Sequence, residues 1–304
     1  MYVPESEVRA ALTYKALIPA IRQALIDYSA GLVVQPPRTI MRAGNAEDHR
    51  NGCFATMPVI AGDVMAVKNV TFYPCNDELG LPTHMAIIEL LRRATGEPLA
   101  VMDGRLITEM RTAAVSAVAL AALASAGVRS LGILGSGVQA RSHLQAFHHV
   151  MPGLTEIRIW SRTTGNAERL AAEAGARATS IEEAASADVV LTVTASAVPV
   201  LEGKWLADKA LVISVGATGA TVRELDDHAT QSSYIVAECK AAAERESGDI
   251  VLSGTKVDAE IGQILAGRVP APVGRRILFK SVGMAIEDLT AARLVWAVRS
   301  GLQS

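Results

Sequence analysis

Two glycines and an alanine, Gly135, Gly137 and Ala140, are spaced as G-x-G-x-x-A between an apolar segment and a helical one. The first glycine of such a turn permits a tight bend, the second lets the backbone approach a phosphate, and the small third residue lets the helix pack closely. The first amides of that helix have no partner within it and can bind an anion. The spacing therefore predicts a site for the pyrophosphate of a dinucleotide, formed by Gly135, Ser136, Gly137, Val138 and Gln139. An ordinary tight turn is the alternative.

The residues after the next predicted strand distinguish two dinucleotides. An acid at this point binds the ribose 2′-hydroxyl of NAD, whereas an arginine accommodates the 2′-phosphate of NADP. Here Ser161, Arg162 and Thr163 supply two hydroxyls and a guanidinium, and no acid ends the strand. The sequence therefore predicts NADPH as the cofactor, with NADH as the alternative. A solvent-exposed turn whose arginine binds nothing is the other interpretation.

Four cations of the first hundred or so residues, Arg38, Arg42, Lys68 and Arg111, are candidates for binding a carboxylate. Arg111 is expected in the first turn of a long helix, where the helix dipole adds to its charge. Lys68 lies in the middle of an apolar strand, an unusual place for a charge without a function. Each of them can instead extend to solvent. His84 could face the same site, although a lone histidine is more often structural.

The segments that position these residues form two groups. Residues 1–112 predict an α+β unit with a mostly antiparallel sheet, because a helical period over 14–30 precedes alternating strands at 55–57, 63–72, 84–92 and 99–102. A long helix is expected over 108–126, with Thr108 as its N-cap.

The pattern changes after residue 130 to alternating strands and helices, which predicts an α/β fold with a doubly wound parallel sheet, a Rossmann domain. Strands are expected at 131–134, 156–161, 189–194, 211–215 and 235–237, and helices at 138–150, 166–174, 181–186 and 222–230. Thr194 and Val215, near two strand ends, join the predicted cofactor-binding residues. A strand and turn at 278–283 precedes a terminal helix over 285–299 that is expected to return to the first unit. The predicted domains are 1–112 with 276–304, and 113–275.

Composition excludes several classes of function. The 304 residues are 50% hydrophobic with a net charge of −2, which suits two domains with large cores and gives no reason to expect nucleic acid or an anionic membrane as partner. The three cysteines, Cys53, Cys75 and Cys239, are widely spaced, so we expect a reducing, cytoplasmic compartment and no metal site. The first residues lack a signal-peptide pattern, and the longest apolar run, 113–126, is too short to span a bilayer.

Motifs along nearly the whole chain resemble the ornithine cyclodeaminase/μ-crystallin family, and in particular its ketimine reductase branch. They lie at 35–39, 49–50, 57–58, 70–73, 100–104, 107–108, 111–116, 133–140, 157–163, 223–227, 246–249, 252–254 and 279–288. The resemblance implies a homodimer, in which the amino-terminal sheet domain and the carboxy-terminal helix bind substrate and form the interface. It also implies that Arg38, Lys68 and Arg111 hold a substrate carboxylate, with Thr83 near them and Ser281 and Gly283 near the nicotinamide.

One segment departs from the cyclodeaminase branch. In that branch, the loop that corresponds to the one ending in Glu224 and Leu225 here has a sequence similar to Gly-Gly-Asp-Cys-Pro-Gly-Lys-Thr-Glu-Leu. The alanine dehydrogenase branch also carries an acid at the position of its Asp. This chain has Thr218 or a neighbour in place of the acid. A hydroxyl does not act as a carboxylate base near neutral pH, which argues against both branches.

The expected reaction is therefore NAD(P)H-dependent reduction of a cyclic imino acid, Δ1-pyrroline-2-carboxylate or Δ1-piperideine-2-carboxylate, to L-proline or L-pipecolate. The enzyme contributes orientation and electrostatics, and Lys68 and Arg111 are the expected catalytic residues. Lys68, if burial lowers its pKa, or a bound water would supply the proton. The alternatives are reductive amination of an oxo acid, a cyclodeaminase, and an NADPH-binding protein without turnover, as crystallins are.

Overall fold

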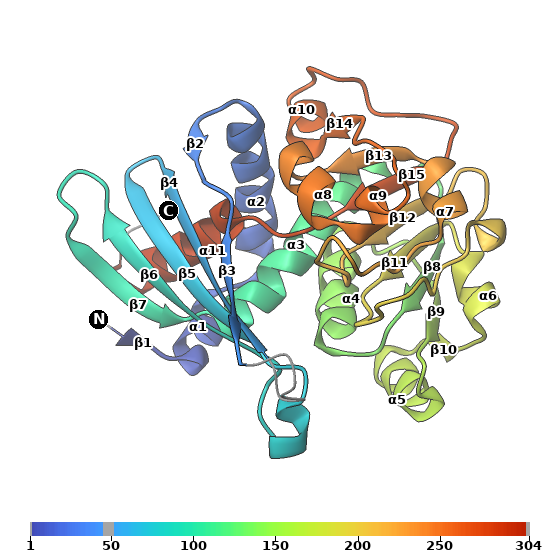
Figure 1. The fold of residues 1–304 in the computed structure, drawn as a ribbon, viewed down its shortest axis with the longest axis horizontal. Coiled ribbons are helices and arrows are strands. Elements are labelled where there is room, and N and C mark those ends of the chain that lie inside the picture. Colours follow the sequence, from blue (N-terminus) through green and yellow to red (C-terminus); the bar gives the residue numbers. More distant parts are fainter. Residues whose placement is uncertain (1, 45–51, 302–304) are drawn as a thin grey trace. The chain divides into compact units, whose positions relative to one another are not determined.

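The structure is a computed structural model that describes residues 2–44 and 52–301, so the motif at 49–50 lies outside the described residues. The chain divides into two compact units, the first formed by Met1–Thr112 with Met284–Ser304 and the second by Ala113–Gly283 (Figure 1). The first boundary falls at the position expected from the sequence. The second does not, because Ile277–Lys280 (β15) pairs with two strands of the second unit's sheet. A short apolar strand carries no local signal for which sheet it joins.

The first unit contains a seven-stranded sheet in the order β1-β7-β6-β5-β4-β2, with β3 paired to β4. Its strands are β1 (Tyr2–Val3), β2 (Val33–Val34), β3 (Thr39–Ala43), β4 (Gly52–Ala61), β5 (Val64–Phe72), β6 (His84–Arg92) and β7 (Pro98–Asp103). β1 runs parallel to β7 and the other pairs are antiparallel. The mostly antiparallel sheet predicted from the alternation is confirmed.

Helices cover one face of this sheet. They are α1 (Glu5–Ala11), α2 (Tyr14–Ser29) and α11 (Ala285–Arg299). A short 3-10 turn, η1 (Asn76–Leu79), lies in the connection between β5 and β6. The terminal helix α11 packs on α2 and on β4, β5 and β6, and Figure 1 shows it behind the strands. Along β5, alternate residues Val64, Ala66 and Lys68 are buried, as the period of two requires.

The long helix α3 (Arg105–Leu123) begins earlier than the sequence predicted, and Thr108 is not its N-cap. The backbone N–H of Thr108 donates to Gly104, and Asp103 Oδ1 accepts the N–H of Arg105 at 2.9 Å. Arg111 therefore lies in the second turn, where a helix dipole contributes little. With its 19 residues, α3 is long and apolar enough to cross a membrane by length and composition alone, and most of it is buried, as in a core helix.

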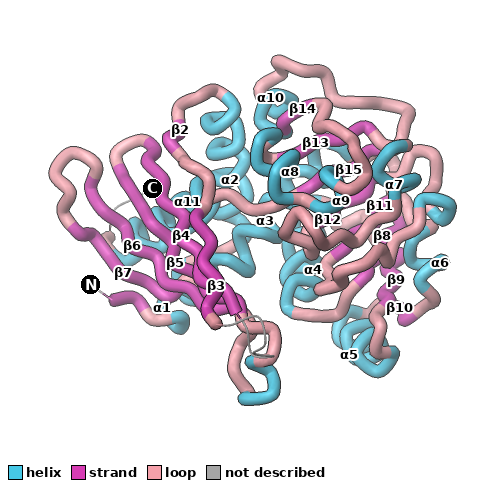
Figure 2. Tube along the Cα trace, in the orientation of Figure 1, coloured by secondary structure: helices cyan, strands magenta, loops and turns pink. Residues whose placement is uncertain are grey.

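The second unit is built on an eight-stranded parallel sheet in the order β10-β9-β8-β11-β12-β15-β13-β14 (Figure 2). The remaining strands are β8 (Ser130–Leu134), β9 (Glu156–Trp160), β10 (Arg177–Ala178), β11 (Val189–Thr192), β12 (Leu211–Ser214), β13 (Tyr234–Ala237) and β14 (Ala259–Glu260). The central strands β8, β11, β12 and β15 are buried throughout, which their continuous apolar runs require. The predicted Rossmann-like parallel sheet is confirmed.

The helices of the second unit are α4 (Val138–Val150), α5 (Thr164–Ala174), α6 (Ile181–Ala185), α7 (Asp227–Gln231), α8 (Lys240–Glu246), α9 (Gly248–Val251) and α10 (Ile261–Leu265), with a 3-10 turn η2 (Gly203–Trp205). The helix predicted over 222–230 starts only at Asp227, because the side chain of Asp226 accepts the N–H of Ala229 and caps it. The residues before it form a loop at the carboxyl end of the sheet.

Candidate active site

The glycine turn between β8 and α4 has the geometry that its spacing predicted. Gly135 adopts a φ of 127°, and a Cβ there would lie 2.7 Å from the carbonyl oxygen of Val193, so only glycine fits. Gly137 precedes α4 and has open space where a Cβ would point. Ala140 is fully buried. The backbone can therefore approach a phosphate at the start of α4, and Ser136, Val138 and Gln139 lie in the same turn.

The end of β9 lies beside this turn. The hydroxyl of Ser136 donates to that of Ser161 at 2.9 Å, and the exposed side chains of Arg162 and Thr163 follow. A guanidinium and hydroxyls at this point fit the 2′-phosphate of NADP. A second arginine, Arg141, donates to the carbonyl oxygen of Ser136 at 3.4 Å.

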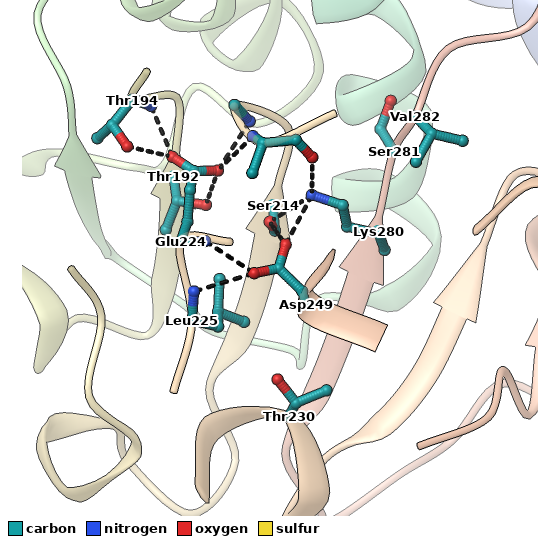
Figure 3. Close-up of polar contacts among 12 residues, drawn as sticks. Thr192, Thr194, Ser214, Glu224, Leu225, Thr230, Asp249, Lys280, Ser281 and Val282 are labelled. Carbon is teal, nitrogen blue, oxygen red and sulfur yellow. Dashed lines mark hydrogen bonds and ion pairs between the residues drawn. The ribbon is translucent and has the colours of Figure 1, made fainter. Parts of the chain in front are cut away.

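A network of buried charges joins the carboxyl ends of three strands of the parallel sheet, shown in Figure 3. Its first member, Glu224, is fully buried, and burial raises the pKa of its carboxyl. The carboxylate accepts five hydrogen bonds, from Thr194 N (2.6 Å), Thr194 Oγ1 (2.7 Å), Thr192 Oγ1 (2.9 Å), Gly216 N (2.8 Å) and Ala217 N (3.2 Å). One acid thus fixes the loops after β11 and β12, which contain the predicted residues Thr194 and Val215.

Lys280 and Asp249 form the second half of this network and are also fully buried (Figure 3). The ammonium of Lys280 lies 2.8 Å from Asp249 Oδ2 and donates to Ser214 Oγ and to the carbonyl oxygen of Ala217, each at 3.0 Å. Asp249 Oδ1 accepts the backbone N–H groups of Glu224 and Leu225 at 2.8 and 3.0 Å. The two acids and the lysine therefore stabilise one arrangement of the loops on which a nicotinamide is expected.

A third buried acid, Glu238, holds the turn that contains Ser281 and Gly283. It accepts the N–H of Val282 at 2.7 Å and the N–H of Gly283, and the Ser281 hydroxyl donates to both of its oxygens, at 3.1 and 3.2 Å. Gly283 has a φ of 78°, which favours glycine. The two residues that the family resemblance placed near the nicotinamide are thus held by a carboxylate.

The first unit contains a separate cluster of buried charges, formed by Lys68 of β5, Arg111 of α3, and Glu287 and Asp288 of α11. Lys68 Nζ lies 2.6 Å from Asp288 Oδ2, and Arg111 donates from Nε to Asp288 Oδ1 at 3.0 Å and from a terminal nitrogen to Glu287 Oε2 at 2.6 Å. Their side chains are at most 7% exposed. The structure thus brings together two of the predicted cations, each already paired with an acid.

The pKa of Lys68 is lowered to about 8. Burial is the largest cause, the charges of Arg111 and Arg38 act in the same direction, and Asp288 opposes them. A lysine with such a pKa remains mostly protonated at neutral pH and gives up its proton more readily than an exposed lysine. Half-buried Arg38 lies close enough for its charge to act on this ammonium, whereas Arg42 is exposed on β3.

His84 lies at the edge of the same cluster, at the start of β6. Its ring is 4.4 Å from that of Phe72, and its Nδ1 is 3.4 Å from the hydroxyl of the half-buried Thr83. The surrounding protein, followed by the charges of Lys68 and Arg111, lowers the pKa of His84, although the ring keeps an exposed edge. The lowered pKa favours the neutral imidazole.

The sequence alone predicted no role for the five buried acids of these charge networks. They are Glu224, Glu238, Asp249, Glu287 and Asp288. The available signal for Glu287 and Asp288 was an acidic pair in the first turn of a mostly apolar helix. Within residues 2–44 and 52–301, no group of three or more His, Cys, Asp or Glu side chains is arranged to hold a metal ion.

A family model and several known proteins match this chain over most of its length. The model described as the ornithine cyclodeaminase/mu-crystallin family matches residues 1–301. Ketimine reductase mu-crystallin of Mus musculus is 41% identical over 92% of this chain and 91% of its own length. The Delta(1)-pyrroline-2-carboxylate/Delta(1)-piperideine-2-carboxylate reductase of Azospirillum brasilense is 33% identical over 95% of this chain and 92% of its own. The solved structure of Thermococcus litoralis Delta(1)-pyrroline-2-carboxylate reductase, in complex with NADH and L-proline, is 32% identical with a TM-score of 0.91, covering 100% of this chain and 99% of that one.

Proposed function

Because this chain belongs to the ornithine cyclodeaminase/mu-crystallin family, we propose that it reduces a cyclic imino acid with NAD(P)H. The substrate is Δ1-pyrroline-2-carboxylate, Δ1-piperideine-2-carboxylate or both, and the product is L-proline or L-pipecolate. The observation that carries the proposal is the buried Lys68–Asp288–Arg111 cluster in a chain that also has a pyrophosphate-binding turn.

The second unit supplies the cofactor site. The amides at the start of α4, after Gly135 and Gly137, bind the pyrophosphate, and Ser161, Arg162 and Thr163 bind the 2′-phosphate of NADPH. The buried acids Glu224 and Glu238 hold the loops at the nicotinamide end. The bound nicotinamide supplies the hydride, and the protein supplies orientation.

The first unit supplies the substrate site. Arg38 and Arg111 bind the carboxylate of the imino acid, and Lys68 donates a proton to the ring nitrogen as the hydride reaches the adjacent carbon. The imine is thereby reduced to a secondary amine, and Lys68 takes a proton from solvent afterwards. A pKa of about 8 suits this role, because the ammonium is present at neutral pH and its proton is easily transferred.

Thr218 separates this reaction from the two related ones. The loop after β12 holds no acid between Val215 and Arg223, so no carboxylate is present there to activate a water or an amine. The alternatives are reductive amination of an oxo acid and binding of NADPH without turnover. The buried, paired Lys68 favours catalysis, because a buried charge is costly to retain without a function.

The deciding experiment follows NADPH oxidation at 340 nm with Δ1-pyrroline-2-carboxylate in the absence of ammonia, beside pyruvate with ammonia. Turnover of the cyclic imine without ammonia is the expected result. Turnover only with the oxo acid and ammonia would replace the proposal with a dehydrogenase. Binding of NADPH with no turnover in any mixture would replace it with a binding protein.

We also propose that the protein is a cytoplasmic homodimer. One face of the first unit's sheet is covered by α11, whereas exposed apolar side chains project from the other face, among them Tyr2, Met41, Met85 and Ile87. An exposed apolar sheet face of this kind supports association with a second copy. Cys53, Cys75 and Cys239 form no disulfide with one another, which suits a reducing compartment.

A further inference from the structure

Asp288 contacts both residues to which the proposed reaction assigns the chemistry of the first unit. Its Oδ1 accepts a hydrogen bond from Arg111 Nε at 3.0 Å, and its Oδ2 lies 2.6 Å from Lys68 Nζ. All three side chains are buried. Because charges interact more strongly away from water, this one carboxylate has a large influence on the position and the charge of both cations.

The neighbouring acid Glu287 is placed differently. It is equally buried in the same turn of α11, and its Oε2 accepts a hydrogen bond from Arg111 at 2.6 Å. The ion pair of Lys68 is with Asp288. The two adjacent acids therefore have different partners. Glu287 binds Arg111, whereas Asp288 binds both Arg111 and Lys68.

Besides Asp288, the charges with the largest effect on Lys68 come from two arginines. Arg111 approaches from α3 and Arg38 from the segment before β3, and both charges disfavour an ammonium at Lys68. His84 lies on the adjacent strand β6, and burial, followed by the charges of Lys68 and Arg111, lowers its pKa. Asp288, in the first turn of α11, is the group that favours the ammonium, and the amino end of its helix stabilises its negative charge.

We propose that Asp288 is a positioning residue of the reductase, which aims the ammonium of Lys68 and the guanidinium of Arg111 and keeps Lys68 protonated between turnovers. The inference rests on the proposed function. In each turnover the Nζ–H bond of Lys68 breaks as the N–H bond of the product forms, and the hydride from the cofactor reduces the adjacent carbon. Lys68 is left neutral, and the charge of Asp288 favours its recovery of a proton from solvent.

The test is the pH dependence of kcat/KM for the cyclic imine in the wild type, Asp288→Asn and the matched control Glu287→Gln. Without the Asp288 charge, the main opposition to Arg111 and Arg38 at Lys68 is lost, so the pH above which activity declines is expected to fall by about one unit or more. Glu287→Gln removes the same charge from the same turn, and its decline is expected at the wild-type pH. An unchanged decline in folded Asp288→Asn, or an equal shift in Glu287→Gln, would overturn the inference.

A second variant, Asp288→Glu, keeps the negative charge and lengthens the side chain. It therefore tests the positioning role separately from the effect on the protonation of Lys68, and it still tests the inference if Asp288→Asn does not fold. The decline is expected at the wild-type pH, with kcat reduced at least about tenfold because the carboxylate no longer fits between the two cations. An unchanged kcat would refute the positioning role. If the wild type itself does not turn over the imine, the proposed function fails, and that result is distinct from either outcome above.

Discussion

The hydroxyl of Ser136 donates to the hydroxyl of Ser161 at 2.9 Å, and this bond joins the glycine turn to the end of β9. The pyrophosphate and 2′-phosphate regions of the proposed cofactor site are therefore held together in the second unit. The proposed specificity for NADPH is expected to depend on the neighbouring residue, Arg162, whose exposed side chain follows directly.

Replacing Arg162 with alanine is expected to raise the KM for NADPH about tenfold or more and to change the KM for NADH little, because only NADPH carries the 2′-phosphate. Initial rates with both cofactors measure the change. Arg169→Ala is the matched control, since this arginine lies on α5 and its side chain donates to Asn166. Equal effects of Arg162→Ala on both cofactors would show that Arg162 does not read the phosphate.

Replacing Lys68 with glutamine is expected to lower kcat by a factor of about 10² to 10⁴, the range for loss of a general acid. The decline of wild-type activity as pH rises through about 8, the pKa of Lys68, is expected to disappear in the variant. Rates from pH 6 to 9.5, taken at saturating NADPH, test both effects. A variant that keeps the decline would assign the proton to another group, such as a bound water.

The buried His143 makes the stability of the second unit depend on pH. Its Nδ1 is 2.7 Å from the carbonyl oxygen of Gln139 and its Nε2 is 2.9 Å from Ser116 Oγ, and burial lowers its pKa to about 4. The folded state therefore binds this proton less tightly than the unfolded chain does. Stability is fully present above about pH 6.5 and is lost as pH falls toward 4, by up to about 3 kcal/mol.

The urea midpoint of the second unit, followed by the fluorescence of Trp160 and Trp205, is expected to fall between pH 7 and pH 5. His143→Gln removes the titrating group and is expected to reduce this fall. Identical pH profiles for the two proteins would show that His143 does not control the acid sensitivity.

Removing the ammonium of Lys280 is expected to destabilise the second unit strongly. Lys280→Met leaves the carboxylate of Asp249, which is fully buried, without its cation. Loss of one partner from a buried ion pair costs about 3 to 5 kcal/mol. Urea unfolding of Lys280→Met and of the double variant Lys280→Met/Asp249→Asn measures the effect. The double variant is expected to be the more stable of the two, and the reverse order would contradict the assigned pairing.

A charge on the exposed sheet face is expected to disrupt the proposed homodimer. Ile87 is 43% exposed on β6, and Ile87→Glu places a charge within the apolar face. Light scattering after gel filtration measures the mass, and a shift of the variant toward monomer is expected. Val273→Glu, at a residue that is 85% exposed in the second unit, is the control. A wild type that is already monomeric would refute the dimer.

The sequence by itself determined the features that depend on local backbone geometry. The glycine turn at Gly135 was predictable because a positive φ and a close backbone approach exclude other side chains. The parallel strands of the second unit and the alternating strand around Lys68 were predictable because hydrophobic periods reflect local structure. The helix limits at Arg105 and Asp227 were missed, since each depends on which nearby aspartate supplies the cap.

Only the tertiary structure decided which charges pair in the interior. Arg111 and Asp288 are 177 residues apart, and no spacing in the chain links them. Glu224 meets Thr194, and Glu238 meets Gly283, only because the sheet brings strand ends together. Periodicity shows that a face is buried, but the partner of a buried charge is set by the packing of distant segments. Burial then makes each unpaired charge costly, so that packing also fixes which acid holds which cation.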